Sequence, residues 1–305
     1  MSNGITLATG EVRHAASYRH YTLRQGDSDP RGQWSGGDRS IGSGKPVEEA
    51  QIDLQVVGCY DGKIDGQFGA ATALAVKRFQ WNLGNVDRCI TGRPGGLLVP
   101  RATRHVPVTG RIDATTANEL HAWARGGLRT TGTLRIAPLA GYRALVRGTL
   151  KALQHPAVTR ETMVVHAGFL EALDDIDAAA VRAKIKLRIN QAFRVAGAPV
   201  GGAVVRPATR SQHLIGNAID WNIENDGKVI LAAKTVYSQL PRNVQGFIDE
   251  VKNAGLRWGG DWATRDPIHF DAFIDPYGQD FSMLYFFNQR SIQQQHPLDK
   301  APTTC

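Results

Sequence analysis

Apolar residues recur at helical spacing in three short segments of the first 125 residues. The first two segments cover residues 47–57 and 70–83, and each brings its apolar side chains to one face of a helix. A third begins after Asp113, a residue type that caps helix N-termini, and it carries Leu120 and Trp123. Helices of this length are unstable alone, so the three must share a core. We therefore expect a small three-helix module over residues 47–125.

The pattern changes from about residue 159. Apolar residues four positions apart predict helices, and alternation of apolar with polar residues predicts strands. The predicted helices cover residues 178–195 and 243–254, and the predicted strands cover residues 202–205, 217–223 and 268–273. Because these elements do not follow a strict alternation of strand and helix, they favour an α+β domain over residues 159–290.

The remaining segments are polar, basic or rich in glycine and proline. We expect a loose arm at residues 1–46, in which Tyr21-Thr22-Leu23 adds a short ordered piece, and an insertion at residues 84–109 within the first module. Residues 126–158 read as a basic linker with a helix from Leu139 to Leu153, and residues 291–305 as a tail outside any core.

Composition narrows the class of protein. The chain has 305 residues, 42% hydrophobic and 21% charged, which fits two globular domains. The formal net charge of +8 favours anionic surroundings, but Lys and Arg are scattered and no motif for nucleic-acid recognition is present. No apolar run approaches the roughly 20 residues that span a bilayer. Residues 1–24 have no apolar segment of a secretory signal, so we expect synthesis in the cytoplasm and delivery by another route.

The three cysteines, Cys59, Cys89 and Cys305, are too few for a disulfide scaffold. None lies beside a histidine at the spacing of a metal site. Whether Cys59 and Cys89 pair is left open by the sequence.

The strongest chemical signal is a pair of histidines, His213 and His269, each close to a carboxylate. Asp220 follows His213 by seven residues, and Asp266 precedes His269 by three. Because side chains alternate along a strand, Asp220 and His269 can both point away from the apolar faces of their strands, with His213 on the preceding turn. Two imidazoles and a carboxylate can bind zinc and leave a fourth position open, as in catalytic sites. One such histidine alone would ordinarily be structural; the whole set makes a zinc hydrolase the hypothesis.

Other polar and aromatic residues lie close to this set in the sequence. Asp261 is an alternative to Asp266 as a general base, and Asp271 shares the face of His269 and can orient its imidazole. Trp258 and Trp262 are either core or cleft-wall residues, or platforms that stack on sugars.

Glycines and Asp-Gly turns in the first module carry a family resemblance. The motif comprises Gln51-x-x-Leu54, Gly58-x-Tyr60-x-Gly62-x-Ile64-Asp65-Gly66-x-Phe68-Gly69, Thr72, Ala75-Val76 and Phe79-Gln80. It resembles the first type of peptidoglycan-binding domain, from which residues 84–109 depart by a longer link. There is also an internal echo, because Gly62-Lys63-Ile64-Asp65 precedes the second helix and Gly110-Arg111-Ile112-Asp113 precedes the third.

A second resemblance covers residues 159–290. Its motifs are Ser211-x-His213-x-x-Gly216-x-Ala218-x-Asp220, Trp258-Gly259-Gly260-Asp261-Trp262 and Asp266-x-x-His269-Phe270. They resemble the VanY-type D-alanyl-D-alanine carboxypeptidase family, whose endolysin members cut stem-peptide bonds of peptidoglycan. The resemblance implies the small α+β fold shared with hedgehog signalling domains.

The same resemblance implies roles for particular residues. His213, Asp220 and His269 match the zinc ligands, and Asp266 matches the catalytic carboxylate. The family also has a substrate-binding Arg at the end of the strand before the Ser-x-His motif. Arg206 is the better match for it and Arg210 the alternative, with Ser211 beside them.

We therefore expect a peptidoglycan hydrolase in which the first module binds the wall and the second domain cuts a stem-peptide amide. A zinc-bound water would attack the amide, with Asp266 as general base. An endopeptidase is the first expectation; the alternatives are a D-Ala-D-Ala carboxypeptidase and a non-catalytic wall-binding protein.

The delivery route is open between two cases. One is a bacteriolytic phage endolysin that reaches the wall with the help of a holin, and the other is an antibacterial effector injected by a secretion machine. In both cases we expect a monomer that acts in the periplasm or on the cell wall, with no nucleic-acid partner.

Overall fold

The computed structural model describes residues 5–6, 12–13, 17–29, 45–85, 106–130, 132–148, 153, 155–199, 208–230, 236–296 and 298–300. The chain divides into two compact units, Met1–Thr130 and Thr131–Cys305. The first unit is helical and the second is α+β with a mixed sheet, as the sequence predicts.

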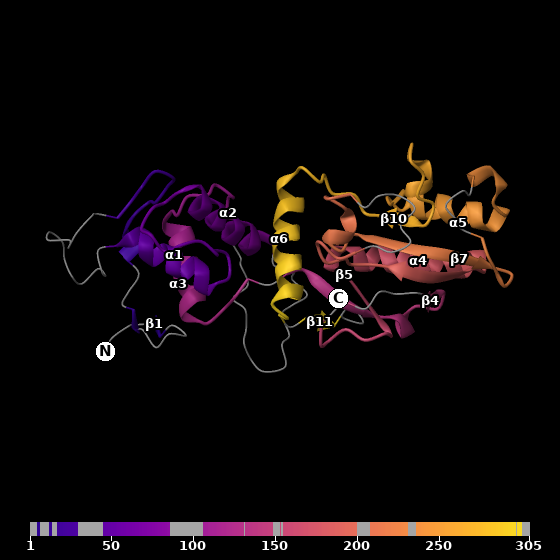
Figure 1. Cartoon of the computed structure of the whole chain (residues 1–305), viewed down its shortest axis with the longest axis horizontal. Helices are drawn as coiled ribbons and strands as arrows, with labels where there is room; N and C mark the ends of the chain where they lie inside the picture. Colours follow the sequence, from indigo (N-terminus) through magenta and orange to yellow (C-terminus); the bar gives the residue numbers. More distant parts are fainter. Residues whose placement is uncertain are drawn as a thin grey trace. The chain divides into compact units, whose positions relative to one another are not determined.

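The helices of the two units appear in Figure 1. They are α1 (Pro46–Val56), α2 (Ala70–Asn85), α3 (Ala114–Arg125), α4 (Leu170–Ala183), α5 (Arg242–Asn253) and α6 (Gln279–Gln293). The strands are β1 (Ile5–Thr6), β2 (Val12–Arg13), β3 (Leu134–Pro138), β4 (Leu145–Arg147), β5 (Thr162–His166), β6 (Lys186–Gln191), β7 (Ala218–Asn225), β8 (Lys228–Val229), β9 (Arg257–Trp258), β10 (His269–Asp271) and β11 (Asp299–Lys300). Among the described residues, no helix has the length and apolar character that crossing a membrane requires.

The three helices of the first unit enclose one apolar core, as predicted. Leu54 and Phe79 are fully buried, and the Phe79 ring meets the edge of Trp123 at 5.7 Å between centroids. Asp113 caps α3, because its Oδ1 accepts a hydrogen bond from the Thr116 backbone N–H at 2.8 Å.

Two buried glutamines reveal the internal repeat of this unit. The Gln51 amide on α1 accepts from the N–H of Gly66 and donates to the carbonyl of Gln67 and to Thr72. Gln80 on α2 makes the same contacts with Gly110, Arg111 and Thr116. Gly66 and Gly110 share a positive φ, 67° and 76°. The repeat therefore pairs Gly66 with Gly110, which differs by four residues from the alignment of Gly62–Asp65 with Gly110–Asp113 that the sequence suggested.

Part of the segment predicted as a loose arm is packed against the first unit. Tyr18 is fully buried, and its hydroxyl donates to Asp53 on α1 at 2.5 Å. Leu23 forms a bridge with Ile112, which confirms order around Tyr21–Leu23, and Ser28 forms another with Gln67. The arm prediction is therefore wrong for residues 17–29, because a few apolar side chains in a polar segment suffice to anchor it.

The larger sheet of the second unit has the order β4-β6-β7-β10-β9, with β8 on the edge of β7. Strand β4 runs parallel to β6, whereas the pairs β6–β7, β7–β10 and β10–β9 are antiparallel. A smaller sheet has the order β11-β3-β5. Strand β7 is thus held on both sides over the length that carries Asp220.

The two faces of β7 differ as the alternation predicts. The buried face carries Ile219, Trp221 and Ile223, which pack with residues of α4 and α5. Both helices are labelled next to β7 in Figure 1. The Trp221 ring stacks on Phe270 of β10 at 4.7 Å. Asp220 and Asn222 lie on the other face and stay partly accessible. The helices therefore cover one side of the sheet and leave the other for polar chemistry.

One predicted helix of the second unit is wrong. Residues 178–195 divide between the end of α4, at Ala183, and strand β6, with Lys184 at φ 57° between them. Apolar residues four positions apart also lie on one face of a strand, because four is an even number. Ile185, Leu187 and Ile189 are all buried, so the period in this stretch is two.

The predicted linker and tail also belong partly to the second unit, which begins at residue 131. The helix predicted from Leu139 to Leu153 is wrong over its described part, which forms a 3-10 turn at Leu139–Gly141 and strand β4, because Leu145–Arg147 pairs with β6. In the tail, α6 continues to Gln293 with Ile292 buried, and β11 pairs with β3. The predicted strand at 202–205 and most of the 84–109 insertion lie outside the described residues, as do Cys89 and Cys305; Cys59 is buried.

Candidate metal centre

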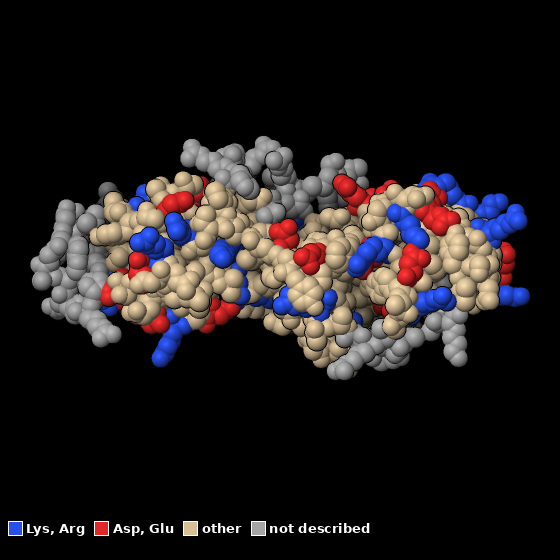
Figure 2. Space-filling model, turned by 90° about the horizontal axis from the view of Figure 1, so that it is seen from above, with Lys and Arg blue, Asp and Glu red and all other residues tan. Residues whose placement is uncertain are grey.

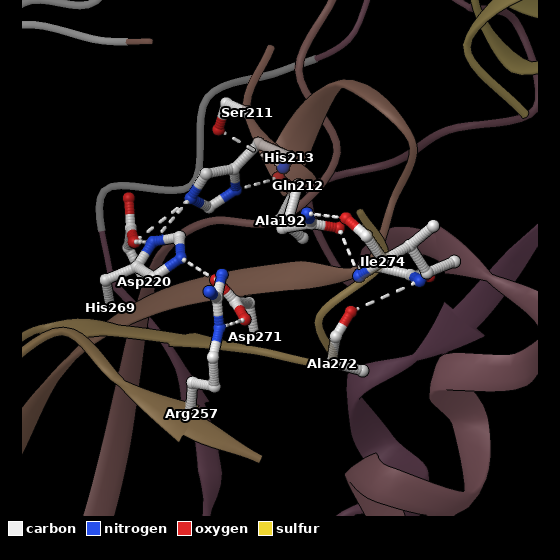
Figure 3. Close-up of polar contacts among 11 residues, drawn as sticks. Ala192, Ser211, Gln212, His213, Asp220, Arg257, His269, Asp271, Ala272 and Ile274 are labelled. Atoms are coloured by element: carbon white, nitrogen blue, oxygen red, sulfur yellow. Dashed lines mark hydrogen bonds and ion pairs between the residues drawn. The ribbon is translucent and has the colours of Figure 1, made fainter. Parts of the chain in front are cut away.

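Strands β7 and β10 bring the predicted ligands together. In their antiparallel register His269 lies directly opposite Asp220, so both side chains share the polar face of the sheet. His213 lies on a short 3-10 turn, Gln212–Leu214, that ends just before β7. Figure 3 shows the two imidazoles and the Asp220 carboxylate converging from these three segments.

The three converging atoms are nearly equidistant. His213 Nε2 lies 3.1 Å from Asp220 Oδ1 and 3.1 Å from His269 Nδ1, and His269 Nδ1 lies 2.9 Å from Asp220 Oδ1. Within the described residues this is the group of His, Cys, Asp and Glu side chains whose geometry suits a metal ion. Ligands at 2.0–2.1 Å from a tetrahedral zinc ion are about 3.3 Å apart, close to these separations.

Hydrogen bonds from the outer nitrogen of each imidazole determine which ring nitrogen carries the proton and which faces the cluster. His213 Nδ1 donates to the carbonyl of Ala192 at 2.6 Å, because a carbonyl can only accept. His269 Nε2 donates to Asp271 Oδ2 at 3.0 Å. Each ring therefore turns a lone pair toward Asp220. Two nitrogen lone pairs and a carboxylate oxygen at 3 Å repel one another unless a cation or a proton lies among them, so the donor set fits a metal ion.

The charges of the cluster shift its ionisation strongly. Burial opposes the charged form of Asp220, but His213 and His269 outweigh it and hold the pKa of this carboxyl far below its usual range. Burial likewise opposes the imidazolium of His269, yet hydrogen bonds and charges from Asp220 and Asp271 raise its pKa to about 9. Without a bound cation the cluster would therefore hold a proton, which a metal must displace.

Asp266 lies at the edge of the cluster and is half-buried. Burial, followed by the negative charge of Asp220, raises its pKa, while the two imidazoles act in the opposite direction. Its backbone N–H donates to the carbonyl of Gly259, and its carbonyl accepts from the His269 N–H. A Cβ on Gly259 would lie 2.3 Å from the Asp266 carbonyl oxygen, so only glycine permits this approach.

The neighbouring acids have different surroundings. Asp271 is buried and pairs with Arg257 through two hydrogen bonds of 2.8 Å while it accepts from His269, the orienting role expected for it. Asp261 is half-exposed and pairs instead with Lys252 of α5 at 2.6 Å. Asp266 therefore feels the charges of the cluster, whereas Asp261 is held in an ion pair with α5.

The two tryptophans of the Trp-Gly-Gly-Asp-Trp motif have separate environments. Trp258 is 2% exposed and donates its ring N–H to the carbonyl of Pro267, as a core residue does. Trp262 is partly exposed, and its ring lies 4.9 Å from that of His269. It therefore forms a wall of the metal centre.

The predicted substrate-binding residues are placed differently. Arg206 lies outside the described residues. Arg210 is exposed and donates to the carbonyl of Pro276 at 2.7 Å. Ser211 begins the turn of His213, and its hydroxyl accepts from the His213 N–H at 3.4 Å.

Sequence reasoning missed Arg194, which follows β6 by three residues. It is 8% exposed, and burial lowers its pKa while the charge of Asp220 acts in the opposite sense. A guanidinium stays charged even when buried, so Arg194 places a positive charge near the cluster. Its place just after a strand could have revealed it, but the helix predicted over 178–195 concealed that strand.

A buried amide on α6 joins two segments of the centre. Gln289 donates to the carbonyls of Arg194 at 2.9 Å and Leu214 at 2.7 Å, and accepts from the Ala196 N–H at 2.8 Å. The loop that carries Arg194 and the turn that carries His213 are thus held by one side chain.

The positive net charge is not concentrated on the face seen in Figure 2, where Lys and Arg are interspersed with Asp and Glu. Several basic residues of the second unit are paired, including Arg182 with Glu250 and Arg188 with Glu224.

Comparison with known families agrees with both motif resemblances. Residues 205–272 match the model of a family described as D-alanyl-D-alanine carboxypeptidase, and this segment contains His213, Asp220, Asp266 and His269. Residues 43–86 match the peptidoglycan-binding domain family. No curated protein matches the chain. The two resemblances are confirmed, and together they support a peptidase that acts on peptidoglycan.

Proposed function

We propose that the protein is a zinc-dependent peptidase that cuts an amide bond of the peptidoglycan stem peptide. The observation that carries the proposal is the convergence of His213 Nε2, His269 Nδ1 and Asp220 Oδ1 within 3.1 Å, with both imidazole protons on the outer nitrogens. A zinc ion held by these atoms would supply Lewis-acid chemistry, lowering the pKa of a coordinated water and polarising the scissile carbonyl.

The residues around the cluster support a division of roles. Asp266 is half-buried with a raised pKa, so it can take a proton from the attacking water and return it to the leaving amine. Arg194 can hold a carbonyl or carboxylate oxygen of the substrate. Asp271, fixed by Arg257, keeps the proton of His269 on Nε2 and its lone pair on the cluster side.

The first unit would bind the wall and raise the local concentration of stem peptide at the second. We propose an endopeptidase first, as in endolysins. The description of the matched family favours a carboxypeptidase that removes a terminal D-Ala as the second candidate. Either activity would serve a phage endolysin or an injected antibacterial effector.

Digestion of purified sacculi, followed by mass spectrometry of the muropeptides, tests the proposal. An endopeptidase gives fragments cut at an internal amide, and a carboxypeptidase gives the loss of one alanine. Both products should disappear with a chelator and return with zinc. Intact muropeptides from zinc-loaded protein would instead indicate a wall-binding protein without catalytic activity.

A further inference from the structure

A stack of rings and a guanidinium extends from the metal centre to the solvent. Trp262 lies against the imidazole of His269, and the Arg257 guanidinium carbon lies 5.8 Å from the Trp262 ring centroid. The same carbon lies 3.8 Å from the ring centroid of Phe273, which is 50% exposed. The stack therefore ends in an aromatic residue that is open to solvent.

A second pair of an aromatic ring and a guanidinium involves Tyr277, four residues after Phe273. The Arg210 guanidinium is 5.1 Å from the ring centroid of Tyr277, which is 82% exposed. Its Nη1 donates to the carbonyl of Pro276, which fixes the guanidinium beside the ring. Each exposed aromatic residue of the segment 272–278 thus lies against an arginine.

This segment is tied to both ligand-bearing parts of the centre. The Gln212 amide, beside His213, donates to the Ile274 carbonyl at 2.7 Å and accepts from the Ile274 N–H at 3.3 Å, as Figure 3 shows. On the other side, Phe273 follows the ligand His269 by four residues, so at most about 14 Å of chain separates them. The segment that carries both rings is consequently held to the turn of His213 and follows directly after the strand of His269.

The two arginines differ in charge balance. Arg257 is neutralised by Asp271, whereas no carboxylate of the described residues pairs with Arg210. An exposed ring next to an uncompensated guanidinium suits a ligand that has both apolar groups and a carboxylate. A stem peptide has this character, and an uncharged sugar does not.

We propose that Phe273, Tyr277 and Arg210 form a binding rim that holds the carboxylate-bearing stem peptide beside the metal centre. The rim rests on the proposed function and names a substrate contact for it. It lies outside residues 205–272, which the peptidase family model matches, apart from Arg210. It would position the peptide without taking part in bond cleavage.

Binding of small probes to the zinc-loaded full chain tests the rim. The background variant is Asp266→Asn, which keeps a peptide probe from being consumed. The probes are a synthetic stem tetrapeptide with free carboxylates, the same peptide amidated, and chitotetraose, each titrated calorimetrically. Phe273→Ala and Tyr277→Ala should each weaken the free peptide about three- to tenfold. Val229→Ala, at an exposed apolar position on β8, should leave it unchanged.

The other probes separate the outcomes. Amidation of the peptide should weaken its binding to the chain with the unaltered rim. The affinity for chitotetraose should be the same in the rim variants as in the chain with the unaltered rim. Unchanged peptide affinity in both rim variants, or weakened affinity for chitotetraose alone, overturns the rim. In the chain with native Asp266, absent hydrolysis with rim-dependent peptide binding would remove the proposed function and leave the rim. Hydrolysis with an unchanged KM in both rim variants would leave the proposed function and overturn the rim.

Discussion

At the residue scale, the two histidines of the centre differ in what holds their outer nitrogen. His213 donates to a neutral carbonyl, whereas His269 donates to the carboxylate of Asp271, which Arg257 in turn fixes. A carboxylate partner makes an imidazole more basic and a stronger metal ligand. The same contact makes the proton on His269 the main competitor of a metal ion.

Zinc affinity should therefore depend on pH with a definite sign. Because the pKa of His269 is about 9 without a cation, binding below that pH must displace one proton. Affinity should fall about tenfold for each unit of pH from 9 toward 7 and level off above 9. Competition with a calibrated chelator at several pH values measures this, and an affinity that is constant from pH 7 to 9 would contradict it.

Asp266 can be tested apart from the metal. Asp266→Asn keeps the size and the backbone contacts of the residue but removes the base, so kcat on a soluble stem peptide should fall about 10²–10⁴-fold. Zinc content and thermal stability should stay as in the unaltered chain. Asp261→Asn is the matched control, since Asp261 pairs with Lys252; a loss of activity in Asp261→Asn alone would exchange the two roles.

Sequence reasoning works well for residues whose role depends on alternation. The faces of Asp220 and His269 follow from the apolar residues beside them, and the register of β7 and β10 then brings them together. Arg194 could not be found this way, because no periodicity predicts a buried charge. Its place depends on the bend of the chain after Gln191 and on Gln289, 95 residues away.

At the element scale, short helices with an apolar face could be predicted from the sequence. Strands whose partners lie far away in the sequence could not. The bounds of α5 follow its pattern closely, from Arg242 to Asn253. By contrast, β4 and β11 pair with neighbours distant in sequence, and their residues carry too little local signal. Tertiary pairing decides such segments, and local propensity cannot.

We expect helix α6 to influence zinc binding through Gln289, which is not itself one of the proposed ligands. Gln289→Leu removes three hydrogen bonds that hold the Arg194 loop to the His213 turn. We expect zinc affinity to fall about tenfold, as for other residues outside a ligand shell. Gln80→Leu makes the same change at a fully buried glutamine of the first unit, and it should leave zinc affinity unchanged. Equal zinc affinities in the two variants would reduce Gln289 to a purely structural role.

At the scale of the whole molecule, two compact units imply two separable unfolding events. The proposed zinc ion binds only the second unit, so a chelator should lower that unit's transition by about 10 °C for an ion at a thousand times its Kd. The transition of the first unit should not move. Calorimetry with and without chelator measures both transitions. If only the transition of the first unit shifted, the metal would bind the first unit and contradict the prediction.

The central claim is that one zinc ion is held by His213, Asp220 and His269. Elemental analysis of protein that has been stripped, refilled with zinc and desalted tests this most directly, on the unaltered chain and on His213→Ala, Asp220→Ala and His269→Ala. We predict about one zinc ion per chain in the unaltered protein and a loss of most of it in each variant. Zinc that stays bound in all three variants, or an unaltered folded chain that takes up none, would contradict the account.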